Sequence, residues 1–374
     1  MKKLNLALIF GGRSAEHEVS IVSALQLYPW INKDKYQIYL IYLDSQNQAY
    51  LCPFLKGKNY RDFIKNTLKK GKRVEFSRQG IYLSSLLRKK KVLLDVALLV
   101  LHGAYGEDGK LQGMLDFLEI PYTGSGVLGS VLGMDKVIMK KIFAELNLPL
   151  TAYQWFWQED FQNNMPDIIG QLEKKLGYPM FVKPASAGSS IGVNRAENRK
   201  KLIKAIKSAI QFDNKILVEQ EVKGAIDINC SALGGLQPEV SVCEQPLTEK
   251  NFLSFEDKYL KGGKTKGMVG LSRIMPAPIP DEKAEEIQKI TKKVFRELNC
   301  WGIARIDFLY QKKTGKVFVN EINTIPGSLA YYFWKVNGIE PGELIDRLVE
   351  LALEKMARAK KLNYRFQSPI LDQK

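Results

Sequence analysis

The sequence predicts a protein of mixed α/β and α+β class, with an N-terminal parallel α/β domain followed by two α+β lobes. The chain has 374 residues and is 45% hydrophobic, which is typical of a soluble protein with two or three domains. In the first third, apolar runs of strand length alternate with helical patterns, as in parallel sheets. Near the C-terminus, two alternating runs flank a Thr-Gly turn and predict an antiparallel hairpin. We place the three units at residues 1–124, 125–220 and 221–374.

The first unit begins with the apolar run LNLALIF and a GG turn, which together predict a strand that enters a glycine turn. A helix is expected through Val19–Leu27, with Ser14 or a neighbouring residue as its cap. Further strands are expected at Tyr36–Leu43 and at Val92–Leu101, and the second ends at the loop HGAYGEDG. Residues 55–91 are basic and carry no clear pattern.

The second and third units continue the alternation of helices and strands. In the second unit, helices are expected at Met134–Leu146, Asp167–Leu176 and Lys200–Gln211, and strands at Tyr153–Trp157, Met180–Lys183 and Lys215–Glu219. The third unit carries the hairpin at Ala304–Asn323 and a closing helix at Gly342–Ala359. An amphipathic helix is also expected after Asp281, its N-cap, because apolar residues recur there at helical spacing: Ala284, Ile287, Ile290, Val294 and Leu298.

Cysteine spacing and the length of apolar runs exclude several classes of protein. The four cysteines are widely spaced, so they indicate neither a metal site nor a disulfide framework, and a reduced, cytoplasmic protein is expected. The longest apolar run, Val92–Leu101, is far shorter than the ~20 residues that a spanning helix needs, so no membrane insertion is expected. The N-terminus MKKLNLALIF imitates a secretory signal, but its apolar part is too short and no cleavage site follows.

The net charge of +16 admits nucleic acid, an anionic membrane surface or small phosphorylated ligands as partners. Much of the excess lies in Lys56–Lys91 and in the tail segment ARAKK. Blocks of like charge are usually solvated surfaces. No aromatic residues interleave with arginines, and no helix-turn-helix or zinc-finger spacing occurs, so nucleic acid is not an expected partner.

The hairpin RIDFLYQKKTGKVFVNEIN is the most informative segment. If residues 313–315 form the turn, Asp307 lies opposite Glu321, and Arg305 lies opposite Asn323. Side chains alternate between the faces of a strand, so these four project from one face. The other face is expected to point into a core through its apolar residues, Ile306, Phe308, Phe318 and Ile322.

Two carboxylates directly opposite each other repel, and a hard divalent cation is a natural way to offset that repulsion. Magnesium takes a few carboxylate or amide oxygens and completes its shell with phosphate and water, and Asp307, Glu321 and Asn323 supply such a set. The alternative is an exposed face on which the acids pair with Arg305 and Lys316. The hairpin pattern alone leaves both interpretations open.

A second segment, MFVKPASAGSSIGV, is suited to hold phosphate. A strand ends at Lys183, and the small residues of the loop Ser186–Gly192 allow backbone N–H groups to approach an anion. No Walker A sequence occurs in the chain, and a flexible turn is the alternative. Lys136 is a further candidate phosphate ligand, although alone it would be taken as a surface lysine. The strand ILVEQ could offer Glu219 to the exocyclic amine of adenine, or it could be an ordinary interior strand.

Together these segments resemble the ATP-grasp fold, in which two α+β lobes hold ATP between them. The finer resemblance is to the D-alanine–D-alanine ligase family and runs over nearly the whole chain. The similar blocks follow the family's order: GGRSAEHEVSIVSA, HGAYGEDGKLQGML, GSGVLGSVLGMDK, FVKPASAGSSIGV, SFEDKYL, GIARIDF and NEINTIPG. Several short blocks in the right order are very improbable by chance.

The resemblance implies a nucleotide and metal site. Lys136, Lys183 and the loop residue Ser190 would bind the phosphates of ATP, and Glu219 would lie at the adenine. Two Mg²⁺ ions, for which Mn²⁺ can substitute, would be held by Asp307, Glu321 and Asn323.

The resemblance also implies roles around the amino-acid substrates. Glu16 would bind the ammonium of the first D-alanine, and His102 would lie near its carboxylate. A hydrogen-bonded group of Glu16, Ser189 and Tyr259 would close a lid, for which we select residues 250–272. Arg305 and the backbone N–H of Gly327 would stabilise the oxyanion.

The sequence departs from the family in two places. After NEINTIPG, Tyr332 and Phe333 stand where the family usually has a serine-leucine pair that holds the second amino acid's carboxylate. The Tyr332 hydroxyl can still donate a hydrogen bond, so we keep Tyr332 as a substrate-binding candidate. The segment KGAIDINCSALG is one residue longer than the family's usual form, and Asp227 is our candidate for binding the ribose hydroxyls.

The expected activity is ATP-dependent ligation of two D-alanine molecules for peptidoglycan precursor synthesis. A related ligase with another acceptor, such as D-lactate, D-serine or another amino acid, is the first alternative. A non-catalytic protein that binds nucleotide or nucleic acid is the second. The expected partners are ATP and D-alanine or a similar amino acid, and a homodimer is left open.

Overall fold

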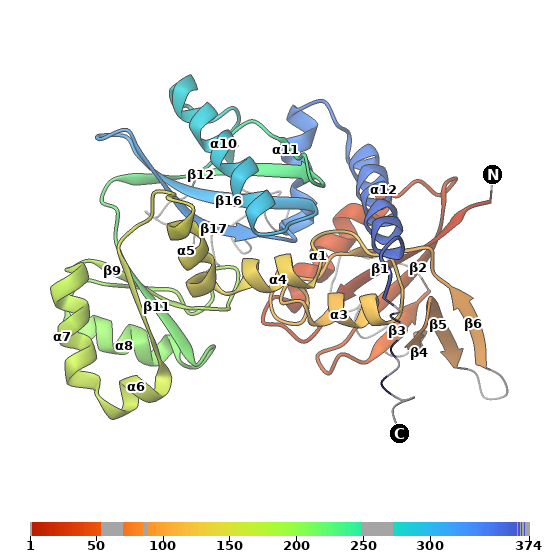
Figure 1. Ribbon diagram of the computed structural model, residues 1–374, viewed down its shortest axis with the longest axis horizontal. Coiled ribbons are helices and arrows are strands. Elements are labelled where there is room, and N and C mark those ends of the chain that lie inside the picture. Colours follow the sequence, from red (N-terminus) through yellow and green to blue (C-terminus); the bar gives the residue numbers. More distant parts are fainter. Residues whose placement is uncertain are drawn as a thin grey trace.

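The structure is a computed structural model that describes residues 2–53, 70–84, 89–247 and 272–364, with residues 366, 368 and 370. Its described part contains three main sheets with helices packed against them (Figure 1). Within this part, no helix combines the length and the apolar character that are needed to cross a membrane.

The first sheet has seven strands in the order β6-β5-β4-β3-β2-β1-β7. Its strands are β1 (Leu4–Gly11), β2 (Tyr36–Leu43), β3 (Ala49–Cys52), β4 (Lys72–Ser77), β5 (Gly80–Ser84), β6 (Lys89–Leu93) and β7 (Val96–Leu99). Strands β2, β1 and β7 are parallel neighbours, as predicted for the first domain. Strands β4 to β6 extend the sheet in antiparallel fashion, and the basic, poorly patterned sequence did not predict them.

The prediction of one strand at Val92–Leu101 is wrong, because the chain changes partner at Asp95. Val92 and Leu93 belong to β6 and pair with β5, whereas β7 begins at Val96 and pairs with β1. At the switch, the Asp95 carboxylate accepts a hydrogen bond from the Asn5 backbone N–H at 2.7 Å, and the Asp95 N–H donates to the Asn5 carbonyl at 2.9 Å. Both sides of the switch are apolar, so hydrophobicity alone does not mark it.

Helix α1 (His17–Leu27) packs against β1. Its N-cap residue is Glu16, and the expected cap Ser14 acts one step earlier, where its hydroxyl accepts the Glu16 backbone N–H at 3.0 Å. Among the described residues, this region also contains the 3₁₀ helix η1 (Tyr28–Trp30), α3 (Lys110–Phe117) and α4 (Val127–Met134).

The end of the chain returns to the first sheet. Helices α11 (Tyr331–Val336) and α12 (Pro341–Lys360) share one hydrophobic core with β1, β2 and β7. Trp334 and Leu348 are 1% exposed in this core, beside Leu6 and Leu8. Figure 1 shows α12, in blue, lying against the first region of the chain.

The central lobe is a four-stranded antiparallel sheet in the order β10-β9-β11-β8. Its elements are β8 (Tyr153–Trp157), β9 (Met180–Pro184), β10 (Asn194–Ala196), β11 (Lys215–Gln220), α6 (Gln158–Asn163), α7 (Met165–Leu176) and α8 (Arg199–Ala209). Helix α5 (Lys136–Glu145) replaces the predicted helix Met134–Leu146. The break arises at Asp135, which is extended and accepts hydrogen bonds from the backbone N–H groups of Val137 and Ile138.

The third sheet has the order β13-β12-β16-β17. Its elements are β12 (Ala225–Gly234), β13 (Glu239–Val240), β16 (Gly302–Gln311), β17 (Lys316–Asn323), α10 (Asp281–Glu297) and the adjacent strand pair β14 (Gln245–Pro246) and β15 (Arg273–Ile274). Asp281 is the first helical residue of α10 rather than its N-cap, which is Pro280. An acid in the first turn still interacts favourably with the helix dipole.

The hairpin β16–β17 has the predicted register at its functional end. Asp307 lies opposite Glu321, and Arg305 lies opposite Asn323. The loop is longer than predicted, because Gln311 pairs with Lys316 and residues 312–315 form the turn.

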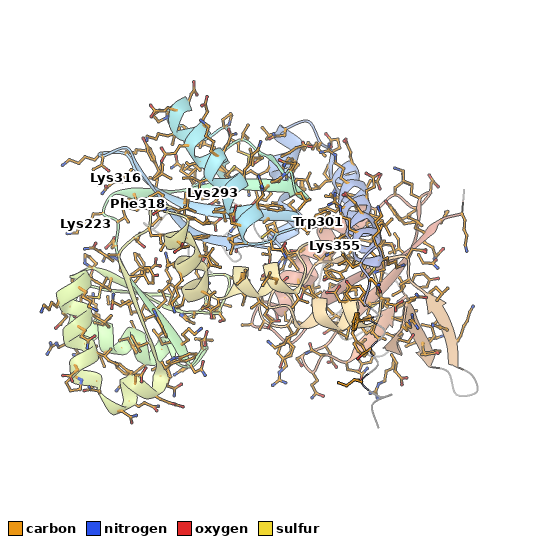
Figure 2. The ribbon with its side chains drawn as sticks, viewed as in Figure 1. Lys223, Lys293, Trp301, Lys316, Phe318 and Lys355 are labelled. Atoms are coloured by element: carbon orange, nitrogen blue, oxygen red, sulfur yellow. The ribbon has the colours of Figure 1, made fainter. Side chains whose placement is uncertain are left out.

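A β-bulge at Asn320 restores the register, since Asp307 pairs with Glu321 whereas Phe308 pairs with Val319. A bulge inserts an extra residue into one strand, so every side chain before it changes face. The prediction that Phe318 points into the core is therefore wrong: Val317 and Val319 are buried there, and Phe318 is partly exposed beside Leu309 (Figure 2).

Candidate active site

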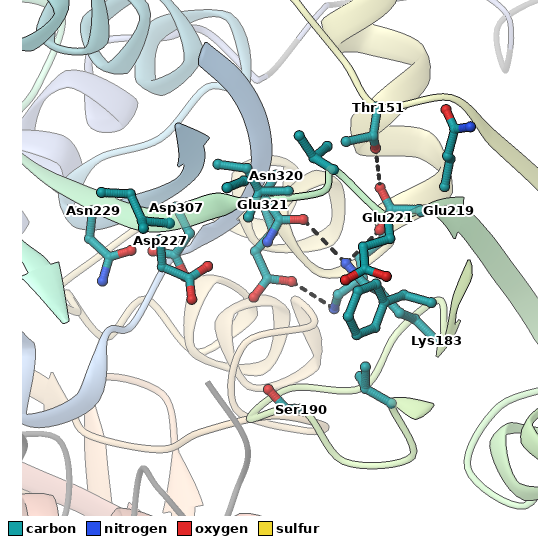
Figure 3. Close-up of a pocket in the computed structure, with 18 of the residues that line it drawn as sticks. Thr151, Lys183, Ser190, Glu219, Glu221, Asp227, Asn229, Asp307, Asn320 and Glu321 are labelled. Carbon is teal, nitrogen blue, oxygen red and sulfur yellow. Dashed lines mark hydrogen bonds and ion pairs between the residues drawn. The ribbon is translucent and has the colours of Figure 1, made fainter. Parts of the chain in front are cut away.

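A cavity of about 380 Å³ lies between the central lobe and the third sheet. Side chains from β9, β11, β12, β16 and β17 line it, together with Lys136 at the start of α5 and the loop that carries Ala187 and Ser190. Figure 3 shows Lys183 on one side of this space and Asp227, Asn229 and Asp307 on the other.

Two lysines share the Glu219 carboxylate in the wall of the cavity. Lys140 Nζ lies 2.5 Å from Glu219 Oε1, and Lys183 Nζ lies 2.5 Å from Oε2. The Thr151 hydroxyl donates a hydrogen bond to Oε1 at 2.7 Å. The Glu219 side chain, predicted to meet adenine, is thus occupied by two cations and a hydroxyl.

The charges of this cluster are held by their mutual attraction. Burial alone would raise the pKa of Glu219, but Lys140 and Lys183 outweigh burial and hold the pKa of that carboxyl well below its ordinary value. Burial lowers the pKa of Lys140, and Glu219 offsets only part of that effect. Burial also acts to lower the pKa of Lys183, but Glu219 and Glu321 raise it above the ordinary value. Lys183 therefore stays positively charged beside the cavity.

The candidate phosphate lysines also contact the candidate metal strand. Lys136 Nζ lies 3.5 Å from Glu321 Oε2 and donates to the Ala187 carbonyl at 2.7 Å. Lys183 Nζ donates to Asn320 Oδ1 at 3.2 Å. The two lysines come from different elements, α5 and β9, and both reach β17 across the same cavity (Figure 3).

On the neighbouring strand, Asp307 is bound by Arg305 and Asn323. Arg305 Nε and Nη2 lie 2.6 and 2.7 Å from the two Asp307 oxygens, and Asn323 Nδ2 donates to Oδ2 at 3.1 Å. Burial would lower the pKa of Arg305, but Asp307 raises it well above its ordinary value. Arg305 is 4% exposed and is therefore a fixed, buried cation.

The oxygens of Asp307, Glu321 and Asn323 fit a hard divalent cation. In the described part of the chain, no cluster of three or more His, Cys, Asp or Glu side chains forms a complete protein-only metal site. Magnesium does not need one, because it usually takes one or two carboxylates and the phosphates of its substrate. Two facing acids beside phosphate lysines match that chemistry.

The glycine-serine loop contacts Glu16 of the first domain. Ser189 donates a short hydrogen bond to Glu16 Oε1, which joins two of the residues that the family resemblance grouped together. A Cβ atom at Gly188 would lie 2.2 Å from Glu16 Oε2, so only glycine permits this approach. Tyr259, the third member of the predicted group, and the predicted lid at 250–272, except for its last residue, lie outside the described residues.

His102 is a buried, neutral histidine at the edge of the first domain. Its Nδ1 lies 3.0 Å from the Ile325 carbonyl, which can only accept, so Nδ1 carries the proton. Its Nε2 then accepts from the Ser23 hydroxyl at 2.9 Å. Burial lowers the pKa of His102 to about 4.

Glu107 connects the same segments and was not singled out in the sequence. Its carboxylate accepts hydrogen bonds from the backbone N–H groups of Gly103, at 2.8 Å, and Ile325, at 2.9 Å. Desolvation, reinforced by the nearby charge of Glu16, raises the pKa of Glu107 to about 8. Glu107 lies in the loop HGAYGEDG, and an acid in a loop directly after a buried strand is the sequence feature that could have pointed to it.

Gly327 begins a buried turn with an unusual backbone. Ser328, Leu329 and Ala330 all have left-handed conformations, with φ of 50°, 52° and 47°. Such residues are costly and persist where packing and hydrogen bonds impose them. Here the Ser328 N–H donates to Ser23 Oγ at 3.1 Å, and the Ser328 hydroxyl donates to Gln26.

The acceptor candidate Tyr332 follows this turn on α11 and is 9% exposed. The ribose candidate Asp227 and the loop residue Ser190 both line the cavity.

The sequence analysis missed two residues of the site. It missed Lys140, although Lys140 follows Lys136 by four residues and so lies on the same helix face. No signal in the sequence pointed to Asn320, whose position depends on the bulge.

Comparisons with known proteins agree with this arrangement. The family model described as D-ala D-ala ligase N-terminus matches residues 5–125, and the one described as D-ala D-ala ligase C-terminus matches residues 142–350. A D-alanine–D-alanine ligase of Thermoanaerobacter sp. (strain X514) is 37% identical over 359 residues, covering 95% of this chain and 98% of the relative. The ligase of Ruminiclostridium cellulolyticum is 38% identical over 370 residues, covering 95% and 96%.

Solved structures show the same likeness over almost the full length. The D-alanine-D-alanine ligase from Coxiella burnetii has a TM-score of 0.79 and 26% identity, covering 96% of this chain and 97% of its own. The VanG D-Ala:D-Ser ligase from Enterococcus faecalis has a TM-score of 0.79 and 28% identity, covering 94% of this chain and 100% of its own. The expected ATP-grasp fold class is confirmed by these neighbours. The chain belongs to the D-alanine–D-alanine ligase family.

Proposed function

We propose that this protein uses ATP to join two D-alanine molecules into D-alanyl-D-alanine, a precursor of peptidoglycan. The observation that carries the proposal is the shared cavity. Asp307 and Glu321 face each other there, and Lys136 and Lys183 reach the same strand from two other elements. This is an arrangement for a triphosphate with divalent metal, placed beside buried groups that can hold an amino acid.

The reaction needs ATP because a free carboxylate is a poor acyl donor. Transfer of the γ-phosphoryl group to the carboxylate of the first D-alanine yields an acyl phosphate and ADP. The amine of the second D-alanine then attacks the acyl carbon, the C–O bond to phosphate breaks, and the amine loses a proton. Phosphoryl transfer depends mainly on positioning and on neutralisation of charge.

The residues of the cavity suit the first step. Lys136, Lys183 and the loop at Ser190 would bind the phosphates, while Asp227 would reach the ribose. Asp307, Glu321 and Asn323 would hold Mg²⁺, and Mn²⁺ can substitute. The bound metal would neutralise the phosphate oxygens. Glu219 would keep Lys183 charged and oriented, which is consistent with its contacts to two lysines and a threonine.

Residues outside the cavity lining suit the binding of the first amino acid and the second step. Glu16, which is 4% exposed, would bind the first D-alanine's ammonium, and the neutral ring of His102 would lie near its carboxylate. Arg305 and the N–H of Gly327 would stabilise the oxyanion that forms when the amine attacks. Preorganised donors of this kind each contribute on the order of a hundredfold or more to the rate.

We place this reaction in the cytoplasm, where ATP is available. The four cysteines are buried and form no disulfide, in keeping with a reducing compartment. We also keep the division into units at residues 1–124, 125–220 and 221–374 as a proposal. The first unit and the C-terminal lobe would supply the amino-acid site, and the two lobes would supply the nucleotide site.

The test combines purified protein with ATP, D-alanine and Mg²⁺ and measures phosphate and dipeptide. We expect both products in equal amounts, loss of both with a chelator, and recovery with Mg²⁺ or Mn²⁺. Glu321→Gln should lower the rate by ~100-fold or more, because it removes a metal ligand. Glu239→Gln is the matched control, since the Glu239 side chain is 62% exposed on the same sheet.

Parallel reactions with D-lactate and D-serine as acceptors identify the product. If the protein releases phosphate rapidly and forms only D-alanyl-D-lactate or D-alanyl-D-serine, then D-lactate or D-serine would replace D-alanine as the proposed acceptor. Full activity of the Glu321→Gln variant would contradict the proposal that Glu321 binds the metal ion.

A further inference from the structure

Two of the four cysteines lie opposite each other, one on β12 and one on the segment before β14. Asn229 and Glu244 form an antiparallel bridge there, in which each backbone N–H donates to the carbonyl of the other residue at 2.8 Å. The next pair along these two segments is Cys230 and Cys243. Residues that lie directly opposite each other project from the same face, so the two cysteine side chains meet.

This type of pair suits a disulfide. Because Asn229 and Glu244 exchange both backbone hydrogen bonds, Cys230 and Cys243 form the next, non-hydrogen-bonded pair. The Cα atoms of such a pair lie about 4.5 Å apart, and disulfides join residues whose Cα atoms are about 4.4–6.8 Å apart. The two side chains also interact with each other by a hydrogen bond. A bond between the two sulfurs therefore fits the existing backbone.

Helix α10 covers the two thiols. Cys230 is 0% exposed and Cys243 is 3% exposed, and both belong to the core that the third sheet shares with α10. Cys230 Sγ lies 3.5 Å from the Ser241 carbonyl, and Cys243 Sγ lies 3.8 Å from the Ala284 carbonyl. This cover excludes bulky reagents, so a reaction partner has to be as small as a hydroperoxide.

The two thiols differ in acidity. Burial raises the pKa of the Cys230 thiol, but hydrogen bonds, above all from Cys243, outweigh burial and lower the pKa below its ordinary value. The hydrogen bond to Cys230 raises the pKa of Cys243, and burial raises it further. The thiolate is the reactive form of cysteine. Cys230 is therefore the nucleophile of the pair, and Cys243 retains its proton and donates it to the Cys230 thiolate.

We propose that Cys230 and Cys243 are a redox site that a hydroperoxide converts reversibly to a disulfide. The Cys230 sulfur attacks one peroxide oxygen, the O–O bond breaks, and the other oxygen leaves with the Cys230 proton as water or an alcohol. Cys230 is then a sulfenic acid. The Cys243 sulfur attacks the Cys230 sulfur, the S–O bond breaks, and hydroxide leaves as water with the Cys243 proton. The two thiols lose two electrons and two protons, which the peroxide gains.

The disulfide would join the wall of the nucleotide cavity to the β14–β15 pair. Asn229, which precedes Cys230, lines the cavity, and Glu244, which follows Cys243, lies 2.8 Å from Arg273 at the start of β15. In proteins of reducing compartments, disulfides are usually transient and catalytic or redox-sensing. The free thiols of the structure are thus the resting form of the site.

The test treats the reduced full-length protein with hydrogen peroxide, then unfolds and alkylates it and maps the cysteines by mass spectrometry. We expect the loss of two of the four thiols and a mass lower by two hydrogen atoms. One cross-linked peptide pair should carry Cys230 and Cys243. Dithiothreitol should restore both thiols, because a disulfide is reducible whereas a sulfinic acid is not.

Variants test the separate role of each cysteine. Cys243→Ser removes the partner, so peroxide should carry Cys230 beyond the sulfenic acid to a form that dithiothreitol does not reduce. Cys230→Ser removes the nucleophile, so Cys243 should remain a thiol. Cys300→Ala is the matched control and should keep the disulfide. Cys300 is also buried, at 5% exposure, but lies just before the end of β16 where Gly302 pairs with Gly234.

Four free thiols after peroxide treatment would overturn the inference, as would a disulfide that contains Cys52 or Cys300. Irreversible oxidation of Cys230 in the unsubstituted protein would overturn it too, because Cys243 would then not act as its partner. The mapping uses the unsubstituted protein, so the decision does not depend on the folding of a variant. It is also independent of ligation: a protein that made D-alanyl-D-alanine but no disulfide would keep its proposed function and lose only this site.

Discussion

At the scale of single residues, one buried carboxylate in the cavity wall contacts two lysines. Glu219 contacts both Lys140 and Lys183, and all three side chains are largely or fully buried. Buried charge without full compensation is expensive in the empty protein. Glu321 adds negative charge near Lys183 and helps to raise the pKa of this lysine above its ordinary value, so the cluster is compensated before any ligand binds.

The two neighbouring lysines of α5 allow a test of this arrangement. Lys140 is 1% exposed, whereas Lys141 is exposed and lies with its Nζ 4.7 Å from the centroid of the Trp155 ring. We expect Lys140→Met to lower the free energy of unfolding by ~3–5 kcal/mol, the usual cost of breaking a buried ion pair. Lys141→Met should cost less than ~1 kcal/mol. Urea unfolding of the two variants measures the difference.

Similar losses in both lysine variants would mean that the Lys140–Glu219 pair adds little to stability. Lys140 could have been predicted, because it follows the Lys136 candidate by one helical turn. Arg273 and Glu244 could not. Glu244 comes just before β14 and Arg273 begins β15, and only the pairing of these distant strands brings the two side chains to 2.8 Å.

At the scale of elements, the β16–β17 hairpin determines which side chains face the nucleotide cavity. Its turn and its bulge act in opposite directions on the register. The turn at 312–315 shifts the pairing by one residue relative to the predicted turn, and the bulge at Asn320 shifts it back. Asp307 and Glu321 therefore face each other only because both irregularities are present.

Deletion of one residue tests the bulge. Without Asn320, Val319 would still pair with Phe308, and Glu321 would follow it directly and stay opposite Asp307. We expect this deletion to remove the Asn320 contact to Lys183 and to keep Glu321 opposite Asp307, so ligation should fall by about tenfold, the effect of one charge-assisted hydrogen bond. Deletion of Lys313, in the exposed turn, is the control and should keep most of the activity. Rates of phosphate release compare the two.

A protein that lost Asn320 and became inactive would show that the bulge positions the metal ligands in a way that goes beyond its one contact to Lys183. The sequence could predict the facing pairs because carboxylate and amide positions alternate on both strands. It could not predict the bulge, since no glycine or proline marks Asn320. Because the bulge was not predicted, Phe318 was assigned to the wrong face of its strand.

At the scale of the whole molecule, the first sheet is completed by the end of the chain. Trp334, Leu344 and Leu348 belong to the same core as β1, whereas the central lobe has a separate core around Val182 and Ile216. Lys355 on α12 donates to the Gly124 carbonyl at 2.8 Å, and Trp301 on the third sheet donates through Nε1 to Leu351 at 2.8 Å (Figure 2). The closing helix thus joins the first and third regions.

The sequence predicted the sheets better than their packing. Local apolar patterns were enough for β1, β2, β8 and β11, because each of these strands contains a run of at least three apolar residues. Nothing in a local pattern states which sheet a distant helix will cover. The closing helix predicted at Gly342–Ala359 is present as α12, but the partner of its buried face is set by the topology of the complete chain.

Substitution of one core leucine on α12 should therefore destabilise the opposite end of the sequence. Leu348→Ala leaves a cavity beside β1, and we expect it to lower the free energy of unfolding by ~2–5 kcal/mol. Leu362→Ala is the control, since Leu362 is 63% exposed and its loss should cost less than ~0.5 kcal/mol. Hydrogen exchange measured by mass spectrometry locates the effect along the chain.

The regional pattern of exchange distinguishes a shared core from a general loss of stability. In Leu348→Ala, the amides of β1 and β7 should exchange faster, because they open with the core that they share with α12. The amides of β9 and β11 should change least, since their core contains no residue of α12. Equal acceleration in both sheets would indicate that the molecule opens as one unit, and unchanged exchange in β1 would mean that α12 contributes little to the first core.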